Sequence, residues 1–209
     1  MALRAVVFDY GMVLTGPQDP AAYAALLRIT GLERERFESF YWADRHAYDE
    51  GKLTGLEFWR KLLRDAGLEL GNEAVEELNR WDVRMWSTVN PPMVAWQQRL
   101  KERGVKTAIL SNMGDAVLES ILREFDWIQN FDVLVWSYQL HVAKPDAAIY
   151  LHTLERLGTR PEETLFIDDK LVNIEAAQAL GIKAFEFSTA AQLRADLIAA
   201  GFDKNLPLP

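Results

Sequence analysis

Several short apolar segments of the sequence end in polar side chains of types that can do chemistry together. These polar residues are Asp9, Ser111, Asn112, Lys144, Asp168 and Asp169. A carboxylate can act as a nucleophile and form a covalent intermediate with a phosphoryl group. Mg²⁺ prefers oxygen ligands such as carboxylates, and a lysine ammonium can neutralise an anion. If these residues lie together, they indicate a site for metal-assisted attack on a phosphate ester.

The carboxylates divide into one candidate nucleophile and a pair of further candidate metal ligands. Asp9 is the candidate nucleophile. Because an anion would then attack an anion, the reaction needs charge compensation from a divalent cation. We expect Asp9 and Asp168 to bind Mg²⁺, with Asp169 next to the metal or holding its water. Adjacent acids after a buried strand repel each other, and a cation would relieve that repulsion.

The remaining polar residues are candidates for orienting and neutralising the phosphate. We expect Lys144 to neutralise phosphate charge and to orient Asp9. Ser111 and Asn112 are expected to bind the substrate, together with backbone amides that open a predicted helix at residue 115, since helix N-termini attract anions. Donors that are placed in advance supply much of the catalysis in sites of this kind.

The apolar segments themselves predict the sheet that must position these side chains. Continuous runs rich in β-branched residues and bounded by polar residues or glycine are typical of buried strands. The runs lie at 4–8, 105–110, 133–136, 165–167 and 184–187. Helical patterns lie between them, at 93–103, 115–125, 147–157 and 173–180. This alternation predicts a doubly wound, Rossmann-like α/β fold with a parallel sheet, whose strands meet in one crevice at their carboxyl ends.

Residues 17–89 follow a different pattern, with helical periodicity and no convincing strand. We therefore expect a small all-helical domain at 17–89, inserted after the first strand into a core made of 1–16 and 90–209. Four of the seven tryptophans lie in this insertion. Three of its aromatic residues have a spacing suited to helix packing and are expected in its interior: Trp42, Tyr48 and Trp59.

The polar strand ends belong to four ordered motifs. The motifs are residues 8–15 (FDYGMVLT), 109–112 (ILSN), 143–146 (AKPD) with 149–150 (IY), and 166–169 (FIDD). Together they resemble the motifs of the haloacid dehalogenase-like hydrolase superfamily, over most of the chain. Within the insertion, residues 48–54 and 58–59 resemble the small helical cap of one branch. That branch contains sugar-1-phosphate phosphatases and the amino-terminal phosphatase domains of epoxide hydrolases.

The resemblance implies a phosphoric monoester hydrolase that uses Mg²⁺ and acts on a small phosphorylated metabolite through an aspartyl-phosphate at Asp9. It also adds the backbone carbonyl of Gly11 to the metal ligands expected at Asp9, Asp168 and Asp169. The inserted cap would close over the site, exclude water and select the substrate.

Gly11 departs from the usual pattern of the superfamily, in which most phosphatases carry a second aspartate there. That aspartate protonates the leaving oxygen and then activates water. General acid–base help is worth about 10²–10⁴-fold. We therefore expect weak activity on alkyl phosphates and a smaller loss with acyl, aryl or anomeric sugar phosphates. His46 and Asp44 are candidates to replace the missing group, whereas Arg45 and His46 are otherwise expected to be solvated or satisfied within the cap.

Two other functions fit the same residues. A metal-independent 2-haloacid dehalogenase needs no proton for its halide leaving group, which suits Gly11, and the 111–112 pair and Lys144 resemble that branch too. It would leave the acidic pair at 168–169 without a metal, so magnesium dependence separates the two functions. A catalytically silent member that binds a ligand or partner would explain the loss of one carboxyl but not the retention of the others.

Composition limits the partners of the chain. Its 209 residues are 49% hydrophobic and 26% charged, as in soluble globular proteins. The formal net charge of −8 would repel nucleic-acid phosphates and anionic lipid. The sequence has no cysteine and no apolar run of the roughly 18 residues that a membrane span needs. We therefore expect a cytoplasmic protein with a small phosphorylated substrate and no nucleic-acid or membrane partner; the sequence carries no signal for its oligomeric state.

Overall fold

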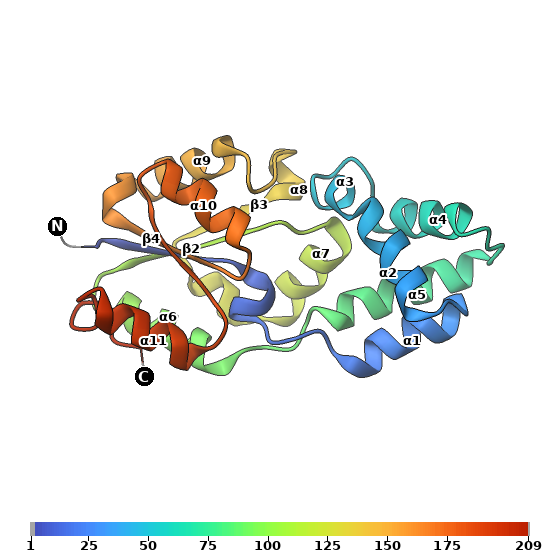
Figure 1. Cartoon of the computed structure of the whole chain (residues 1–209), viewed down its shortest axis with the longest axis horizontal. Coiled ribbons are helices and arrows are strands. Elements are labelled where there is room, and N and C mark those ends of the chain that lie inside the picture. Colours follow the sequence, from blue (N-terminus) through green and yellow to red (C-terminus); the bar gives the residue numbers. More distant parts are fainter. Residues whose placement is uncertain (1–2, 209) are drawn as a thin grey trace.

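The computed structural model describes residues 3–208, and a five-stranded parallel sheet lies at its centre (Figure 1). The strands are β1 (Ala5–Phe8), β2 (Lys106–Ser111), β3 (Val133–Trp136), β4 (Thr164–Asp168) and β5 (Lys183–Glu186). Their spatial order is β3-β2-β1-β4-β5, and every neighbouring pair is parallel. The predicted α/β fold is confirmed, with small shifts at the strand ends.

Helices cover both faces of the sheet. They are α6 (Pro91–Glu102), α7 (Asp115–Glu124), α8 (Ser137–Leu140), α9 (Ala147–Leu157), α10 (Leu171–Ala179) and α11 (Ala190–Ala199). Alternate residues of a strand point to opposite faces. Val6 and Phe8 of β1 therefore pack in one apolar cluster with Trp96 of α6. Val7 packs in the other cluster with Ile149 of α9. Coverage of both faces explains why the strands are apolar without interruption.

The segment between β1 and α6 forms a separate helical unit, which we call the cap. Its helices are α1 (Pro20–Thr30), α2 (Arg34–Ala43), α3 (Arg45–Asp49), α4 (Gly55–Asp65) and α5 (Asn72–Met85). They enclose an apolar cluster of their own. Figure 1 shows the cap at one end of the elongated molecule, beyond the carboxyl ends of the strands. Such a position lets it reach the crevice at those strand ends.

Local sequence signals begin the cap helices. The Asp19 side chain accepts hydrogen bonds from the amides of Ala21 and Ala22, and Pro20 is the first residue of α1. Thr54 and Glu57 form a capping box at the start of α4. These groups satisfy backbone donors that a helix leaves unpaired at its N-terminus.

Two chain segments connect the cap to the core, and they lie side by side. Thr15 and Val89 form an isolated antiparallel bridge. The Gly16 amide donates to the Thr88 carbonyl at 2.7 Å, and the Asn90 amide donates to the Leu14 carbonyl at 2.9 Å. These bonds lie at the domain boundaries that the sequence predicts, 16/17 and 89/90. The two-domain division stays a prediction.

Among residues 3–208, no helix combines the length and the apolar character that crossing a lipid bilayer requires.

Candidate active site

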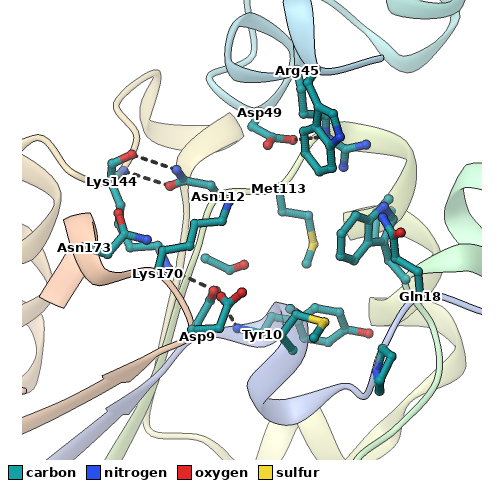
Figure 2. A pocket seen from close by; sticks show the side chains of 18 residues that line it. Asp9, Tyr10, Gln18, Arg45, Asp49, Asn112, Met113, Lys144, Lys170 and Asn173 are labelled. Carbon is teal, nitrogen blue, oxygen red and sulfur yellow. Dashed lines mark hydrogen bonds and ion pairs between the residues drawn. The ribbon is translucent and has the colours of Figure 1, made fainter. Parts of the chain in front are cut away.

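The carboxyl ends of β1, β2 and β4 open into a cavity of about 550 Å³ (Figure 2). Core residues line one side of it, and cap residues such as Arg45 and Asp49 line the other. Of the residues that the sequence singles out for chemistry, those lining the cavity are Asp9, Gly11, Ser111, Asn112, Lys144 and Asp169. The structure therefore brings together side chains that lie up to about 160 positions apart in the sequence.

A buried ion-pair network joins Lys144 to two carboxylates. Its Nζ lies 3.0 Å from Asp9 Oδ1 and 2.5 Å from Asp168 Oδ2. The Lys144 side chain is 1% exposed. Burial lowers the pKa of Lys144, but the two carboxylates outweigh that effect and hold the pKa above its ordinary value. Lys144 is therefore a charged group fixed beside the candidate nucleophile, and its role toward phosphate stays a prediction.

Two residues that sequence reasoning missed complete this network around Asp168. The Asn173 side-chain amide donates to both Asp168 oxygens, at 2.9 and 3.0 Å. The Lys170 amide donates to Asp168 Oδ1 at 2.8 Å. With Lys144, these donors engage both oxygens of the carboxylate. One signal in the sequence is that Asn173 follows the acidic pair at 168–169. The helical pattern at 173–180 predicts a helix there but does not predict a contact between Asn173 and Asp168.

Asn112 fixes the backbone of Lys144. Its side-chain amide donates to the Lys144 carbonyl at 2.8 Å, and its side-chain carbonyl accepts from the Lys144 amide at 2.8 Å. The paired bonds hold the segment after β3 against the end of β2 (Figure 2). Ser111 is buried at the end of β2 and also lines the cavity. Phosphate contact by Ser111 and Asn112 stays a prediction.

The carboxylates form a candidate metal centre. One oxygen from each of Asp9, Asp168 and Asp169 can be chosen so that all three lie within 4.8 Å of one another. The pKa of Asp9 is raised to about 7, because burial, together with the charges of Asp168 and Asp169, raises it more than Lys144 lowers it. Three carboxylates beside the buried Lys144 ammonium and the exposed Lys170 carry an excess of negative charge. A divalent cation with oxygen preference fits this donor set.

A wide turn at Tyr10–Leu14, in which Gly11 and Met12 are not helical, carries the chain away from β1. The Tyr10 amide donates to Asp9 Oδ1 at 2.7 Å, which fixes the carboxylate at the cavity floor. Met12 has a φ of 61°, a left-handed conformation that costs a non-glycine residue roughly 1–3 kcal/mol. The strained residue lines the cavity. Strain of this kind persists where the surrounding structure holds a functional loop in place.

Gly11 is not required by the backbone conformation, because its φ is −64°. A Cβ atom added there would meet only the Trp86 ring, with Cζ3 at 3.9 Å. That separation is an ordinary van der Waals contact. Position 11 therefore accommodates a Cβ atom, and neither the backbone nor this contact requires a glycine there.

On the cap side, Arg45 lies in a buried network of its own. Its Nε donates to Asp49 Oδ1 at 3.0 Å, and Nη1 donates to Asp82 Oδ1 at 3.2 Å. The Tyr41 hydroxyl donates to Asp82 at 2.7 Å and accepts from Arg45. Arg45 is therefore satisfied within the cap, as expected. Because it also lines the cavity, it is nevertheless close to any bound substrate.

The expectation for the cap aromatics was partly wrong. Tyr48 and Trp59 are fully buried, as predicted. Trp42, however, is 48% exposed and lines the cavity. Its neighbour Tyr41 occupies the buried face of α2 together with Phe37, one helical turn earlier. Adjacent residues of a helix point in different directions, so Trp42 faces away from that interior.

The two candidate replacements for the missing acid lie outside the cavity lining. His46 pairs with Glu50 at 3.2 Å, and its side chain is 63% exposed. Asp44 pairs with Lys61 at 2.7 Å. Neither belongs to the residues that line the cavity. The structure thus gives no support to either residue as the proton donor.

The cap is docked on the core beside the site. The Ser137 hydroxyl donates to the Asp49 carbonyl at 2.5 Å. The Gly55 amide donates to Asp115 Oδ1 at the start of α7 at 2.9 Å. The Tyr48 ring packs so tightly on Gly114 that an added Cβ would come within 2.1 Å of it. Gly114 is therefore needed for close approach of cap and core.

Comparison with known proteins assigns this fold and site to a family. The family model "haloacid dehalogenase-like hydrolase" matches residues 3–181. The chain belongs to this family and is a hydrolase. It is 30% identical to a phosphatase of Mycobacterium tuberculosis, over 93% of this chain and 91% of the relative. The confirmed family agrees with the resemblance seen in the sequence motifs.

Solved structures show the same fold. A haloacid dehalogenase family enzyme from Bacteroides thetaiotaomicron, in complex with magnesium and inorganic phosphate, has a TM-score of 0.73 and 21% identity, covering 90% of this chain and 95% of that one. The L-2-haloacid dehalogenase RSc1362 has a TM-score of 0.66 and 24% identity, covering 89% of this chain and 86% of that one. At such identities the likeness concerns the fold alone.

Proposed function

We propose that the protein is a Mg²⁺-dependent phosphatase that transfers the phosphoryl group of a small substrate to Asp9 and then to water. The main observation is the cluster of Asp9, Asp168 and Asp169 around the buried Lys144 ammonium at the floor of the cavity. This excess of negative charge suits a divalent cation and a phosphate bound together. The relative from Mycobacterium tuberculosis, which is named a phosphatase, supports the same activity.

The residues divide between metal binding and positioning. Asp9 and Asp169, which line the cavity, would hold the metal with the Gly11 carbonyl. Bound Mg²⁺ would supply charge compensation for a nucleophilic carboxylate beside an anionic phosphate. Both Asp168 oxygens already accept from protein donors, including Lys144 and Asn173. Asp168 therefore serves mainly to hold Lys144 in place, and its place among direct metal ligands is secondary.

In the first step, an Asp9 oxygen forms a bond to phosphorus while the bond from phosphorus to the leaving oxygen breaks. The leaving group departs with the electron pair. Lys144 keeps Asp9 oriented and neutralises phosphate charge, and Ser111 would donate to a phosphate oxygen. In the second step, water forms a bond to phosphorus while the bond from phosphorus to the Asp9 oxygen breaks. The Asp9 carboxylate keeps the electron pair, the water gives its proton to solvent, and inorganic phosphate leaves.

Gly11 determines which substrates suit this site. It supplies no carboxyl to protonate the leaving oxygen or to activate water. A leaving group that is stable as an anion needs little protonation. The missing carboxyl therefore slows hydrolysis of its ester less than it slows hydrolysis of an alkyl phosphate. We therefore place acyl, aryl and anomeric sugar phosphates ahead of simple alkyl phosphates and expect slow turnover throughout.

The same glycine also favours a second candidate, a 2-haloacid dehalogenase, because halide leaves without a proton. That reaction places the carboxylate of the substrate next to Asp9 and Asp169, with Lys144 already paired. The excess of negative charge at the cavity floor therefore argues for the phosphatase. Release of chloride from 2-chloropropionate in the presence of EDTA would favour the dehalogenase.

The experiment is a phosphate-release assay over acyl, sugar and nucleotide phosphates, with Mg²⁺ or with EDTA. We expect Mg²⁺-dependent hydrolysis of acetyl phosphate, and a loss of at least about 10³-fold in Asp9→Asn because the nucleophile is gone. Asp65→Asn, the same change on the exposed surface of the cap, is the matched control. Activity that survives Asp9→Asn would overturn the proposal, and absence of any hydrolysis would favour a ligand-binding role.

A further inference from the structure

The part of the cavity that lies beyond the carboxylates is apolar and aromatic. It is lined by Met12, Trp42, Trp86, Met113 and Val117. Trp42 is the informative member, because it remains 48% exposed although the other large aromatics of the cap cluster are buried or partly buried. A large aromatic side chain left open at the wall of a cavity indicates a surface that an apolar ligand covers.

Trp86 forms the wall next to the position of the missing carboxyl. Its Nε1 donates to the Tyr41 hydroxyl at 3.1 Å, which fixes the indole. Its ring passes 3.9 Å from the place that a Cβ on residue 11 would take. The side of the site where other members of the family carry an acid is therefore bounded here by an aromatic ring. A leaving group on that side meets apolar surface instead of a proton donor.

The charges of the cap disfavour a second anionic group on the substrate. Arg45 is the cap cation that lines the cavity, and it is paired with both Asp49 and Asp82. One guanidinium with two carboxylates has a net charge of −1. The cation that the cap contributes is thus compensated, and the other cation besides Lys144 that lines the cavity is the exposed Lys170 of the core. The wall formed by aromatic and methionine side chains offers a sugar few hydrogen-bond partners.

These observations converge on one class of substrate, and the inference rests on the proposed phosphatase function. We propose that the protein hydrolyses monophosphate esters of uncharged aromatic alcohols, with the aromatic group against Trp42 and Trp86. Stacking on indole rings gives affinity for such a group. Its phenolate leaves without help from an acid, so the apolar wall and Gly11 serve the same substrate. Asp9 gains the bond to phosphorus, and the phenolate carries away the electron pair and takes its proton from solvent.

The test compares phenyl phosphate with 2-naphthyl phosphate, whose leaving phenols have similar acidity but different apolar area. We expect kcat/KM to be about tenfold higher for the naphthyl ester, mainly through KM, because the second ring buries more apolar surface. Hydrolysis of acetyl phosphate, which has no aromatic group, normalises each enzyme. α-Glucose 1-phosphate serves as the polar comparison and is expected to be the poorest of the esters.

Variants connect this preference to the cavity wall. In Trp42→Ala we expect the naphthyl-to-phenyl ratio to fall from about ten to about two, and Trp86→Phe should lower it by a smaller factor. Leu151→Ala removes a side chain of similar exposure, 50%, that lies on the core surface outside the cavity, and should leave the ratio unchanged. Because Trp42 is half exposed, its replacement should not prevent folding.

Two outcomes would overturn the inference. The first is equal kcat/KM for phenyl and naphthyl esters in the unmodified protein. The second is a Trp42→Ala variant that keeps the full ratio. If acetyl phosphate and glucose 1-phosphate are hydrolysed through Asp9 while aryl esters have no advantage, the proposed function stands and only the substrate class is wrong. If none is hydrolysed with Mg²⁺, the phosphatase function itself fails.

Discussion

The two sides of the cavity differ in how they treat charge. On the core side, Asp9, Asp168 and Asp169 lie around the buried Lys144 ammonium, with the exposed Lys170 at the cavity lining, and three carboxylates against two ammonium groups leave negative charge for a bound cation to balance. On the cap side, Arg45 is paired on both sides, and the exposed surface is aromatic. The core side is thus arranged for chemistry on a charged group, and the cap side for recognition of an uncharged one.

The difference also concerns stability. Buried like charges lower the free energy of unfolding unless a cation lies between them. We therefore expect the core side to reach its full stability only with a divalent cation bound. The cap network needs no added cation, because Tyr41, Arg45 and Asp82 hydrogen-bond to one another within the protein. The stability change caused by a mutation on the core side should therefore depend on Mg²⁺, whereas that of a mutation on the cap side should not.

The largest effect after loss of the nucleophile is expected from Lys144→Met. The change keeps the apolar stem but removes the ammonium that contacts Asp9 and Asp168. Loss of one such electrostatic group costs about 10²–10³-fold in rate. We expect that loss in kcat/KM for acetyl phosphate, with a lower melting temperature in EDTA that Mg²⁺ partly restores. Lys52→Met, on the exposed cap surface, is the control.

A Lys144→Met variant with normal melting behaviour in EDTA would contradict the charge imbalance attributed to the core side, because three carboxylates would then lie together unpaired without penalty.

A smaller effect is expected from Asp82→Asn in the cap. Asp82 is 1% exposed and accepts from Tyr41 and Arg45. The change leaves the Arg45 charge less compensated and should lower the free energy of unfolding by about 2 kcal/mol, with or without Mg²⁺. Because the Tyr41 hydroxyl also fixes Trp86, KM for phenyl phosphate should rise about tenfold while acetyl phosphate changes less. Thermal unfolding and steady-state kinetics measure both effects.

If Asp82→Asn instead lowers kcat equally for both substrates, the assignment of chemistry to the core side and of substrate recognition to the cap side is wrong.

The residues of the core side could be predicted from the sequence for a physical reason. Parallel strands bring their carboxyl ends to one edge, so residues that follow apolar runs must meet there. Asp9, Lys144 and the 168–169 pair were placed in this way, and the structure brings them together. The roles of Asn112 and Asn173 were not readable to the same degree. Their hydrogen bonds depend on which loop lies opposite, and periodicity gives no information about that.

Which cap side chains face the cavity could be predicted less well. Helical spacing shows that aromatic residues share a helix, but it does not decide which of two adjacent ones faces the interior. Tyr41 and Trp42 are such a pair, and the interior side belongs to Tyr41. Pairing of Arg45 with Asp82 joins α3 to α5 across the cap, a contact set by tertiary packing. Recognition surfaces built from different helices are therefore the part that required the structure.

The central claim is that phosphate passes to Asp9 and that Gly11 slows its release. Rapid mixing of 2-naphthyl phosphate with Mg²⁺-loaded protein tests this directly, with phosphorylation of Asp9 followed by mass spectrometry. We expect a burst of about one naphthol per site, accumulation of phospho-Asp9, and slow turnover afterwards. Gly11→Asp, whose Cβ would lie in ordinary contact with Trp86, should shrink the burst and raise turnover about 10²-fold. Linear release without phospho-Asp9, or a burst that persists in Asp9→Asn, would contradict the claim.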